Sequence, residues 1–94
     1  MTDEPTLWRR SPDVAVVDRG ARVVVLALED PATARPLVME GPAAAIWHAL
    51  DEPATTAQVA ERVAADFGLP ATEVEADVAT FIVELRRRGL LLTG

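Results

Sequence analysis

The stretch GPAAAIWHALDEPAT, residues 41–55, contains one complete helix and the start of a second. Pro42 suits the first helical position, because the N–H group that proline lacks would have no partner there. Pro53 ends this helix, whose buried stripe consists of Ile46, Trp47 and Leu50. Thr55 and Gln58 then stand at capping-box spacing, in which each side chain satisfies a free backbone N–H of the other residue. Two helices joined so closely predict a helix-turn-helix segment.

Two longer helices follow from the same kind of pattern. In the second, apolar residues recur every four positions, and Gly68 closes the helix; these residues are Val59, Val63 and Phe67. The third begins with a second capping-box pattern at residues 72–75 and ends at Gly89. Its predicted buried stripe is Val74, Val78, Phe81, Ile82 and Leu85.

Three short apolar runs precede the helices and predict strands. They are residues 14–17, 22–28 and 35–39. Asp30-Pro31 is expected to end the second strand. Pro36 makes the third run an edge strand, since proline cannot donate to a neighbouring strand. Residues 7–9 could start a further strand, and residues 90–92 could form a last short strand or an apolar tail.

The order of these elements predicts the fold class. Strands followed by helices indicate an α+β, winged helix-turn-helix-like domain, with a three-stranded antiparallel sheet followed by three α-helices. Residues 1–94 suffice for one domain, of which residues 1–6 are expected to be frayed.

The composition excludes several function classes. The chain has nine basic residues, all arginine, against fifteen acidic ones, for a net charge of −6. This balance argues against a nucleic-acid partner. The chain has no cysteine, no apolar run of the roughly 18–20 residues that a membrane span needs, and no secretory signal in its first ten residues. We therefore expect a cytoplasmic protein with no membrane partner.

The sequence offers little support for a catalytic site. His48 is the only histidine and Ser11 the only serine, and neither has a partner nearby in the sequence. The acidic residues near the helix starts are explained by the helix dipole. We expect no enzyme activity, no cofactor and no metal site.

A winged-helix DNA-binding regulator is the alternative that the helix-turn-helix pattern keeps open. A recognition helix presents its N-terminal residues to the bases. In the third helix that end carries Glu73, Glu75 and Asp77, which repel phosphate. The only basic run, Arg86–Arg88, lies at the opposite end, where it complements the helix dipole. DNA binding is therefore the less favoured interpretation.

Two segments together resemble a known family. LVMEGPAAAIWHALDEPATTAQVAERVAADFG, residues 37–68, and VEADVATFIVELRRRGLL, residues 74–91, are similar to the PqqD-like proteins, also called RiPP recognition elements. The resemblance extends over about residues 14–92. It is carried by Ile46-Trp47, Leu50-Asp51, Thr56, Val78, Phe81, Ile82, Leu85, Gly89, Leu90 and Leu91. Residues 35–40 depart from the family pattern, because they lack the aromatic residue often found in the third strand.

The resemblance implies a non-catalytic function. Members of the family bind the leader segment of a ribosomally synthesised precursor peptide. The leader adds as a strand to the third strand and docks against the third helix, and it is thereby delivered to a separate modifying enzyme. Standalone members accompany lasso-peptide leader peptidases, radical enzymes and other tailoring enzymes. An accessory subunit that only stabilises an enzyme is a further alternative.

The residues themselves are compatible with such a site. Residues 37–39 could pair with an incoming strand through their main chain. The third helix widens its apolar face toward Ala79 and Val83, although alanine is also a good helix former on a surface. Arg86 and Arg87 could pair with leader carboxylates. The predicted peptide-binding residues are Arg35, Leu37, Val38, Met39, Val78, Ala79, Ile82, Val83, Arg86 and Arg87. Weak self-association through the same edge is left open.

Overall fold

The computed structural model describes residues 5–28 and 35–93. The chain runs through eight elements: β1 (Trp8–Arg10), β2 (Val14–Asp18), β3 (Arg22–Ala27), β4 (Leu37–Glu40), α1 (Pro42–Ala49), α2 (Thr56–Phe67), α3 (Ala71–Arg87) and β5 (Leu91–Thr93). Strands precede helices, so the predicted α+β class is confirmed. The first four residues of the predicted frayed segment, and the predicted break at Asp30-Pro31, lie outside the described residues.

The main sheet has three antiparallel strands in the order β2-β3-β4, as the sequence predicts. In β4, Leu37 pairs with Val25 and Met39 pairs with Val23. The strand begins at Leu37, two positions later than expected, and Arg35 and Pro36 precede it as exposed residues. The prediction of an edge strand is confirmed, since β4 ends the sheet.

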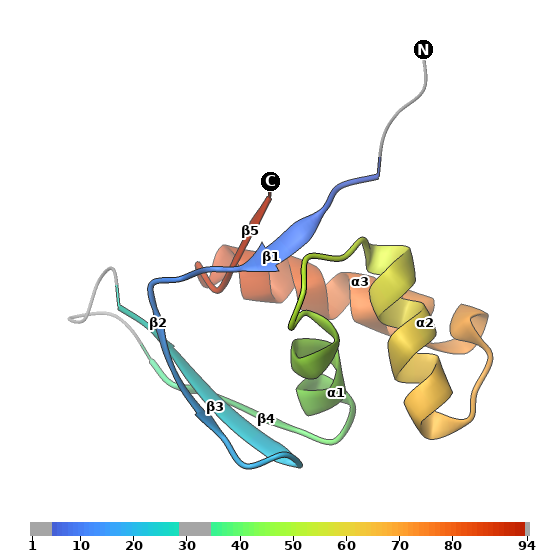
Figure 1. The fold of residues 1–94 in the computed structure, drawn as a ribbon, viewed down its shortest axis with the longest axis horizontal. Helices are drawn as coiled ribbons and strands as arrows, with labels where there is room; N and C mark the ends of the chain where they lie inside the picture. The colour runs from blue at the N-terminus through green and yellow to red at the C-terminus, as the bar shows by residue number, and fades with distance from the viewer. Residues whose placement is uncertain (1–4, 29–34, 94) are drawn as a thin grey trace.

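A second, two-stranded sheet joins the ends of the described chain. β1 and β5 pair antiparallel, with Trp8 opposite Thr93, and Trp8 also bridges to Ala54. The sequence left residues 90–92 as a strand or an apolar tail, and the structure shows a strand from Leu91. Figure 1 shows this pair above α1, apart from the larger sheet.

Arg10 fastens the small sheet to the first helix. Its guanidinium donates a hydrogen bond to the carbonyl oxygen of Trp47 and lies 4.4 Å from the centre of the Trp47 ring. Asp51 contributes an ion pair at 3.5 Å. Burial lowers the pKa of Arg10, while the charges of Asp51 and Asp18 act in the opposite direction. The contact thus ties β1 to α1 across a long sequence distance.

The predicted helix boundaries are confirmed at three places. Gly41 caps α1 at a φ of 58°, with Pro42 at the start of the helix. Thr55 and Gln58 form both bonds of the capping box: the Gln58 N–H donates to the Thr55 hydroxyl at 3.2 Å, and the Thr55 N–H donates to the Gln58 side chain at 2.9 Å. Gly68 closes α2 in the left-handed conformation.

The second capping box, predicted at residues 72–75, is wrong. α3 begins at Ala71 after Pro70, which has no side-chain oxygen to offer, and Thr72 lies inside the first turn. The expected stripe of α2 also ends early, because Phe67 is 47% exposed whereas Val59 is fully buried. Phe67 lies in the last turn of the helix.

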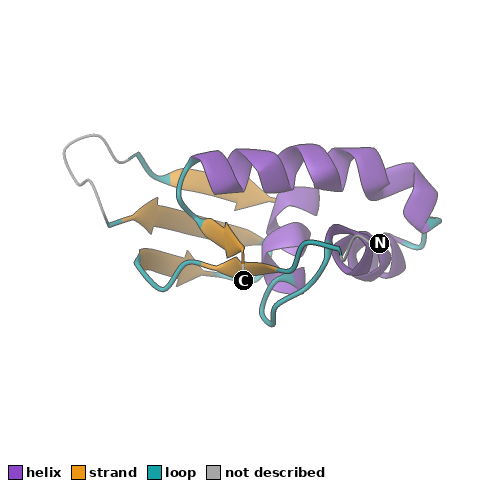
Figure 2. Cartoon of the chain, turned by 90° about the horizontal axis from the view of Figure 1, so that it is seen from above, coloured by secondary structure: helices purple, strands orange, loops and turns teal. Residues whose placement is uncertain are grey.

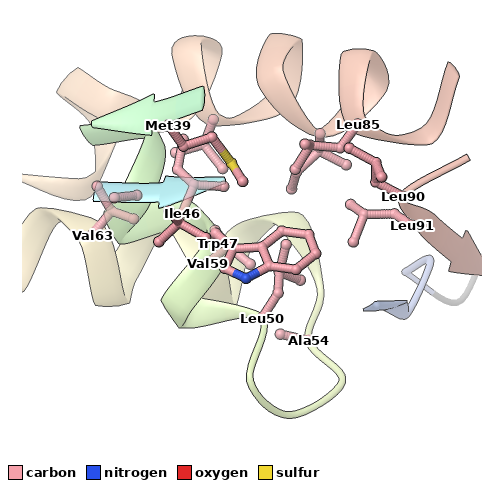
Figure 3. Packing of buried hydrophobic residues seen from close by; sticks show 14 of the residues in the cluster. Met39, Ile46, Trp47, Leu50, Ala54, Val59, Val63, Leu85, Leu90 and Leu91 are labelled. Carbon is pink, nitrogen blue, oxygen red and sulfur yellow. The ribbon is translucent and has the colours of Figure 1, made fainter. Parts of the chain in front are cut away.

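The core lies between the main sheet, the three helices and β5 (Figure 3). Its largest fully buried side chains are Trp47, Met39, Leu50, Ile82, Leu85 and Leu91. Val23 and Val25 of β3, which alternate along the strand, are completely buried, and so is Met39 of β4. The core therefore fixes one face of the sheet against the helical layer.

Replacement of the two capping threonines separates the observed cap from the predicted one. We expect Thr55→Ala to lower the free energy of unfolding by about 0.5–2 kcal/mol, because the Gln58 N–H loses its acceptor. Thr72→Ala is the matched control, and it should leave stability unchanged or raise it by up to about 0.7 kcal/mol through helix propensity. Urea denaturation followed by circular dichroism measures both; equal losses would contradict the observed start of α3.

Adjacent residues of β4 offer a second comparison. Met39→Ala removes a fully buried side chain and should lower the free energy of unfolding by about 2–5 kcal/mol. Val38→Ala, at a position that is 47% exposed, should cost less than about 1 kcal/mol. The same denaturation experiment applies, and a Val38 cost as large as that of Met39 would show that the strand faces are assigned wrongly.

Candidate peptide-binding site

The open edge of β4 is the first component of the candidate site. β4 pairs with β3 on one side, and among the described residues no strand pairs with its other side. The side chains alternate as expected: Met39 points into the core and is fully buried, while Val38 is 47% exposed. In an antiparallel edge strand, alternate residues direct their N–H and C=O groups outward. This edge can therefore accept another strand.

Helix α3 is the second component. In the view of Figure 2, α3 lies over the β4 edge of the main sheet, and both views show the two elements running in opposite directions. Val78, Ile82 and Leu85 turn toward the core and are buried. The remaining face of α3 is open, so a strand added to β4 would have this helix alongside it.

The structure divides the ten predicted peptide-binding residues into three groups. Three are core residues whose side chains do not reach the surface, at 0–1% exposure: Met39, Val78 and Ile82. Leu37 and Ala79 are half-buried. The exposed residues are Arg35, Val38, Val83, Arg86 and Arg87. The side chains of these three residues therefore cannot touch a bound peptide and can only support the residues that do. The main chain of Met39 is the exception, because it lies on the edge strand.

Arg86 faces the small sheet. Its guanidinium carbon lies 5.8 Å from the centre of the Trp8 ring, and the Trp8 indole N–H donates to the Thr56 hydroxyl at 3.1 Å. Ala79 precedes Arg86 by seven positions and so lies on the same face of the helix. The sequence pattern extends the apolar face of the third helix toward Ala79. In the C-terminal half of α3, this side of the helix faces β1.

A hollow of about 560 Å³ lies on another part of α3. Its lining residues are Asp77, Thr80, Phe81, Val83, Glu84 and Arg87. Phe81 is half-buried and packs against the core, so it forms the inner border of the hollow. Asp77, Phe81 and Glu84 follow the helical spacing of one face, on the flank opposite Ala79 and Arg86. The other lining residues, Thr80, Val83 and Arg87, lie further round the helix, toward its outer side.

Sequence reasoning assigned Val83 and Arg87 to the site but missed the other lining residues. The sequence pattern predicts Phe81 in the buried stripe, and the structure shows it half-buried at the edge of that stripe, beside Asp77 and Glu84. A large apolar side chain at such a border is the signal that could have indicated the hollow.

Charges on the outer face of α3 are arranged in order along the helix. The N-terminal half exposes Glu73 and Asp77. In the C-terminal half the Arg88 guanidinium lies 2.9 Å from the Glu84 carboxylate, and Arg87 lies 3.9 Å from it. Two arginines thus share one acid, and the hollow runs from a negative end to a positive end.

His48 has a partner that the sequence did not indicate. Its Nε2 atom lies 2.9 Å from an Asp18 carboxylate oxygen, so the residue links α1 to β2. The Gly20 N–H and His48 hydrogen bonds lower the pKa of Asp18. The pair is a partly exposed surface contact between helix and sheet.

In residues 5–28 and 35–93, no helix combines the length and the apolar character needed to cross a membrane. In the same residues, no group of three or more histidine, aspartate or glutamate side chains could hold a metal ion.

Comparisons with known proteins agree with this geometry. The family model described as "Coenzyme PQQ synthesis protein D (PqqD)" matches residues 22–91. A solved structure, "TbiB1 in Complex with the TbiA(beta) Leader Peptide", superposes with a TM-score of 0.75 at 23% identity, covering 88% of this chain and 93% of that chain. That likeness establishes the fold. No curated protein matches the chain.

Neighbouring arginines test the assignment of Arg86. We expect Arg86→Ala to lower the free energy of unfolding by about 0.5–1 kcal/mol, because the cation–π contact with Trp8 is lost. Arg87→Ala, the control, removes only a long exposed ion pair and should cost about 0–0.5 kcal/mol. Denaturation monitored by tryptophan fluorescence distinguishes them. A larger loss for Arg87 would contradict the contact.

Proposed function

The chain belongs to the PqqD family, and we propose that it binds the leader segment of a ribosomally synthesised precursor peptide without modifying it. The leader adds as a fourth strand to the open edge of β4 and lies against α3. The observation that carries this proposal is the unpaired edge of β4. The hollow, which is lined by residues of α3, would give the added strand a second surface. The TbiB1 structure supports it, since that protein has the same fold and is in complex with a leader peptide.

The affinity would come mainly from the backbone. Each added main-chain hydrogen bond contributes a net free energy of about 0.5–1.5 kcal/mol, and side-chain pockets then select the sequence. Val38 offers an exposed apolar contact on one face of the added strand, and Phe81 offers one at α3. Arg35, exposed at the start of β4, would add about 0–1 kcal/mol with a leader carboxylate.

A separate enzyme would perform the chemistry. The groups at the site are backbone amides, apolar side chains, a threonine, carboxylates and arginines, which bind and orient a peptide. The partner would be a modifying enzyme or a leader peptidase, such as that of a lasso-peptide pathway. Self-association of two copies through β4 would use the same edge, so it would compete with the leader.

DNA binding is disfavoured by the electrostatics of α3. The helix that a winged-helix protein would insert into the groove exposes Glu73, Glu75 and Asp77 in its N-terminal half. Of the basic residues at its other end, Arg88 is paired with Glu84 and Arg86 lies on Trp8. Carboxylates facing phosphates are repulsive, so the peptide remains the better partner.

Titration of a fluorescein-labelled leader peptide, taken from the precursor gene beside this protein's gene, tests the proposal. We expect saturable binding, and we expect Val38→Asp to weaken it about tenfold, because a charge enters the contact face of the added strand. Val17→Asp is the matched control: Val17 is an exposed valine of β2, the opposite edge strand, and its replacement should leave affinity unchanged.

Hydrogen exchange of the same complex locates the peptide. Amides of β4 should exchange more slowly when the leader is bound, while those of β2 should not change. Absence of binding, or protection of β2 in place of β4, would disprove the proposal.

A further inference from the structure

The hollow on α3 has opposite charges at its two ends. Asp77 lines the end nearer the helix N-terminus, and Arg87 lines the other. None of the salt bridges among the described residues involves Asp77. Glu84, between them, has Arg88 as its nearer partner, at 2.9 Å against 3.9 Å for Arg87. Asp77 therefore has no ion-pair partner among these residues, and Arg87 has only the longer contact with Glu84, so both can meet charges of an occupant.

The apolar part of the hollow lies between these charges. Phe81 forms its inner border, and Val83, which is 55% exposed, also lines it. An occupant therefore meets a carboxylate, then apolar carbon, then a guanidinium. The two charges also complement the helix dipole, and this alone would stabilise α3. The dipole does not explain why a hollow lies between them.

The direction of an added strand follows from the sheet. Each strand pair in the main sheet is antiparallel, and antiparallel pairing is slightly more stable per residue than parallel pairing. A strand added antiparallel to β4 runs in the same direction as α3, since α3 and β4 run in opposite directions (Figure 2). Its N-terminal part then lies near Asp77 and its C-terminal part near Arg87.

The spacing of the charges sets the spacing in the peptide. Asp77 and Arg87 are ten positions apart, which is about 15 Å at the helical rise of about 1.5 Å per residue. An extended strand covers that distance in about four or five residues, at about 3.3 Å each. Resting on the leader-binding function proposed above, we propose that the α3 hollow selects leaders in which a basic residue, an apolar residue and an acidic residue follow one another in that order, with the two charges about four or five positions apart.

Selection from a displayed library of random peptides of about fifteen residues tests this inference. Binders of the unaltered protein should show the basic-before-acidic order at least about threefold more often than the reverse, since each exposed ion pair changes affinity by up to about fivefold. The double variant Asp77→Arg with Arg87→Asp, which keeps the net charge, should reverse this preference. Arg19→Asp with Asp66→Arg, at exposed positions outside the hollow, is the control and should keep it.

A milder pair of substitutions guards against loss of folding. Asp77→Asn with Arg87→Gln should abolish the order preference while binding persists. Enriched peptides without a charge order, or with an order that the hollow variants do not change, would overturn the inference and leave leader binding intact. Failure to enrich any peptide on the unaltered protein would count against both the inference and the leader-binding function.

Discussion

The burial of Met39 beneath the first helix is the contact on which the rest of the site depends. Its side chain is completely enclosed among core residues that include Ile46 and Trp47 (Figure 3), although it belongs to a strand of only four residues at the border of the sheet. This anchoring holds β4 in a single register while its outer main chain remains unpaired. A strand held only by its hydrogen bonds to β3 would be free to slip, and a slip by one residue would turn Val38 inward.

Gly41 extends this constraint to the helices. It joins β4 directly to α1 at a φ of 58°, a conformation that residues with a side chain rarely adopt. The edge strand therefore passes into the first helix through a single residue, and β4, α1 and α3 all contribute to the same core. A peptide at this edge would meet a preformed surface, so little of its binding free energy would be consumed in ordering the protein.

Much of the fold could be predicted from the sequence because its signals are local. Pro36 indicated an edge strand, and Thr55 with Gln58 indicated a helix start, since both depend on neighbouring backbone groups. The same local reasoning gave the wrong start for α3, where Pro70 precedes Ala71 and the helix begins before Thr72. A capping-box spacing shows only that a side chain could reach a backbone N–H group. Here the helix starts two residues before the predicted position, with Pro70 in place of Thr72 as the capping residue.

The candidate site was less predictable because its flanks are set by contacts between distant residues. Arg86 and Phe81 lie on opposite flanks of α3, and Trp8 covers the flank of Arg86. The helical periodicity of α3 alone cannot predict which flank Trp8 covers. The partner of His48 lies thirty positions away in the sequence and could not be predicted for the same reason.

The small β1–β5 sheet has a consequence for how such a domain could be connected to other polypeptides. It brings the two ends of the described chain side by side, above α1 in the view of Figure 1. A covalent tether attached at either end would leave from this location and would not have to cross β4. The same binding surface could thus operate in a free-standing protein or within a larger fused enzyme, without any change to its architecture.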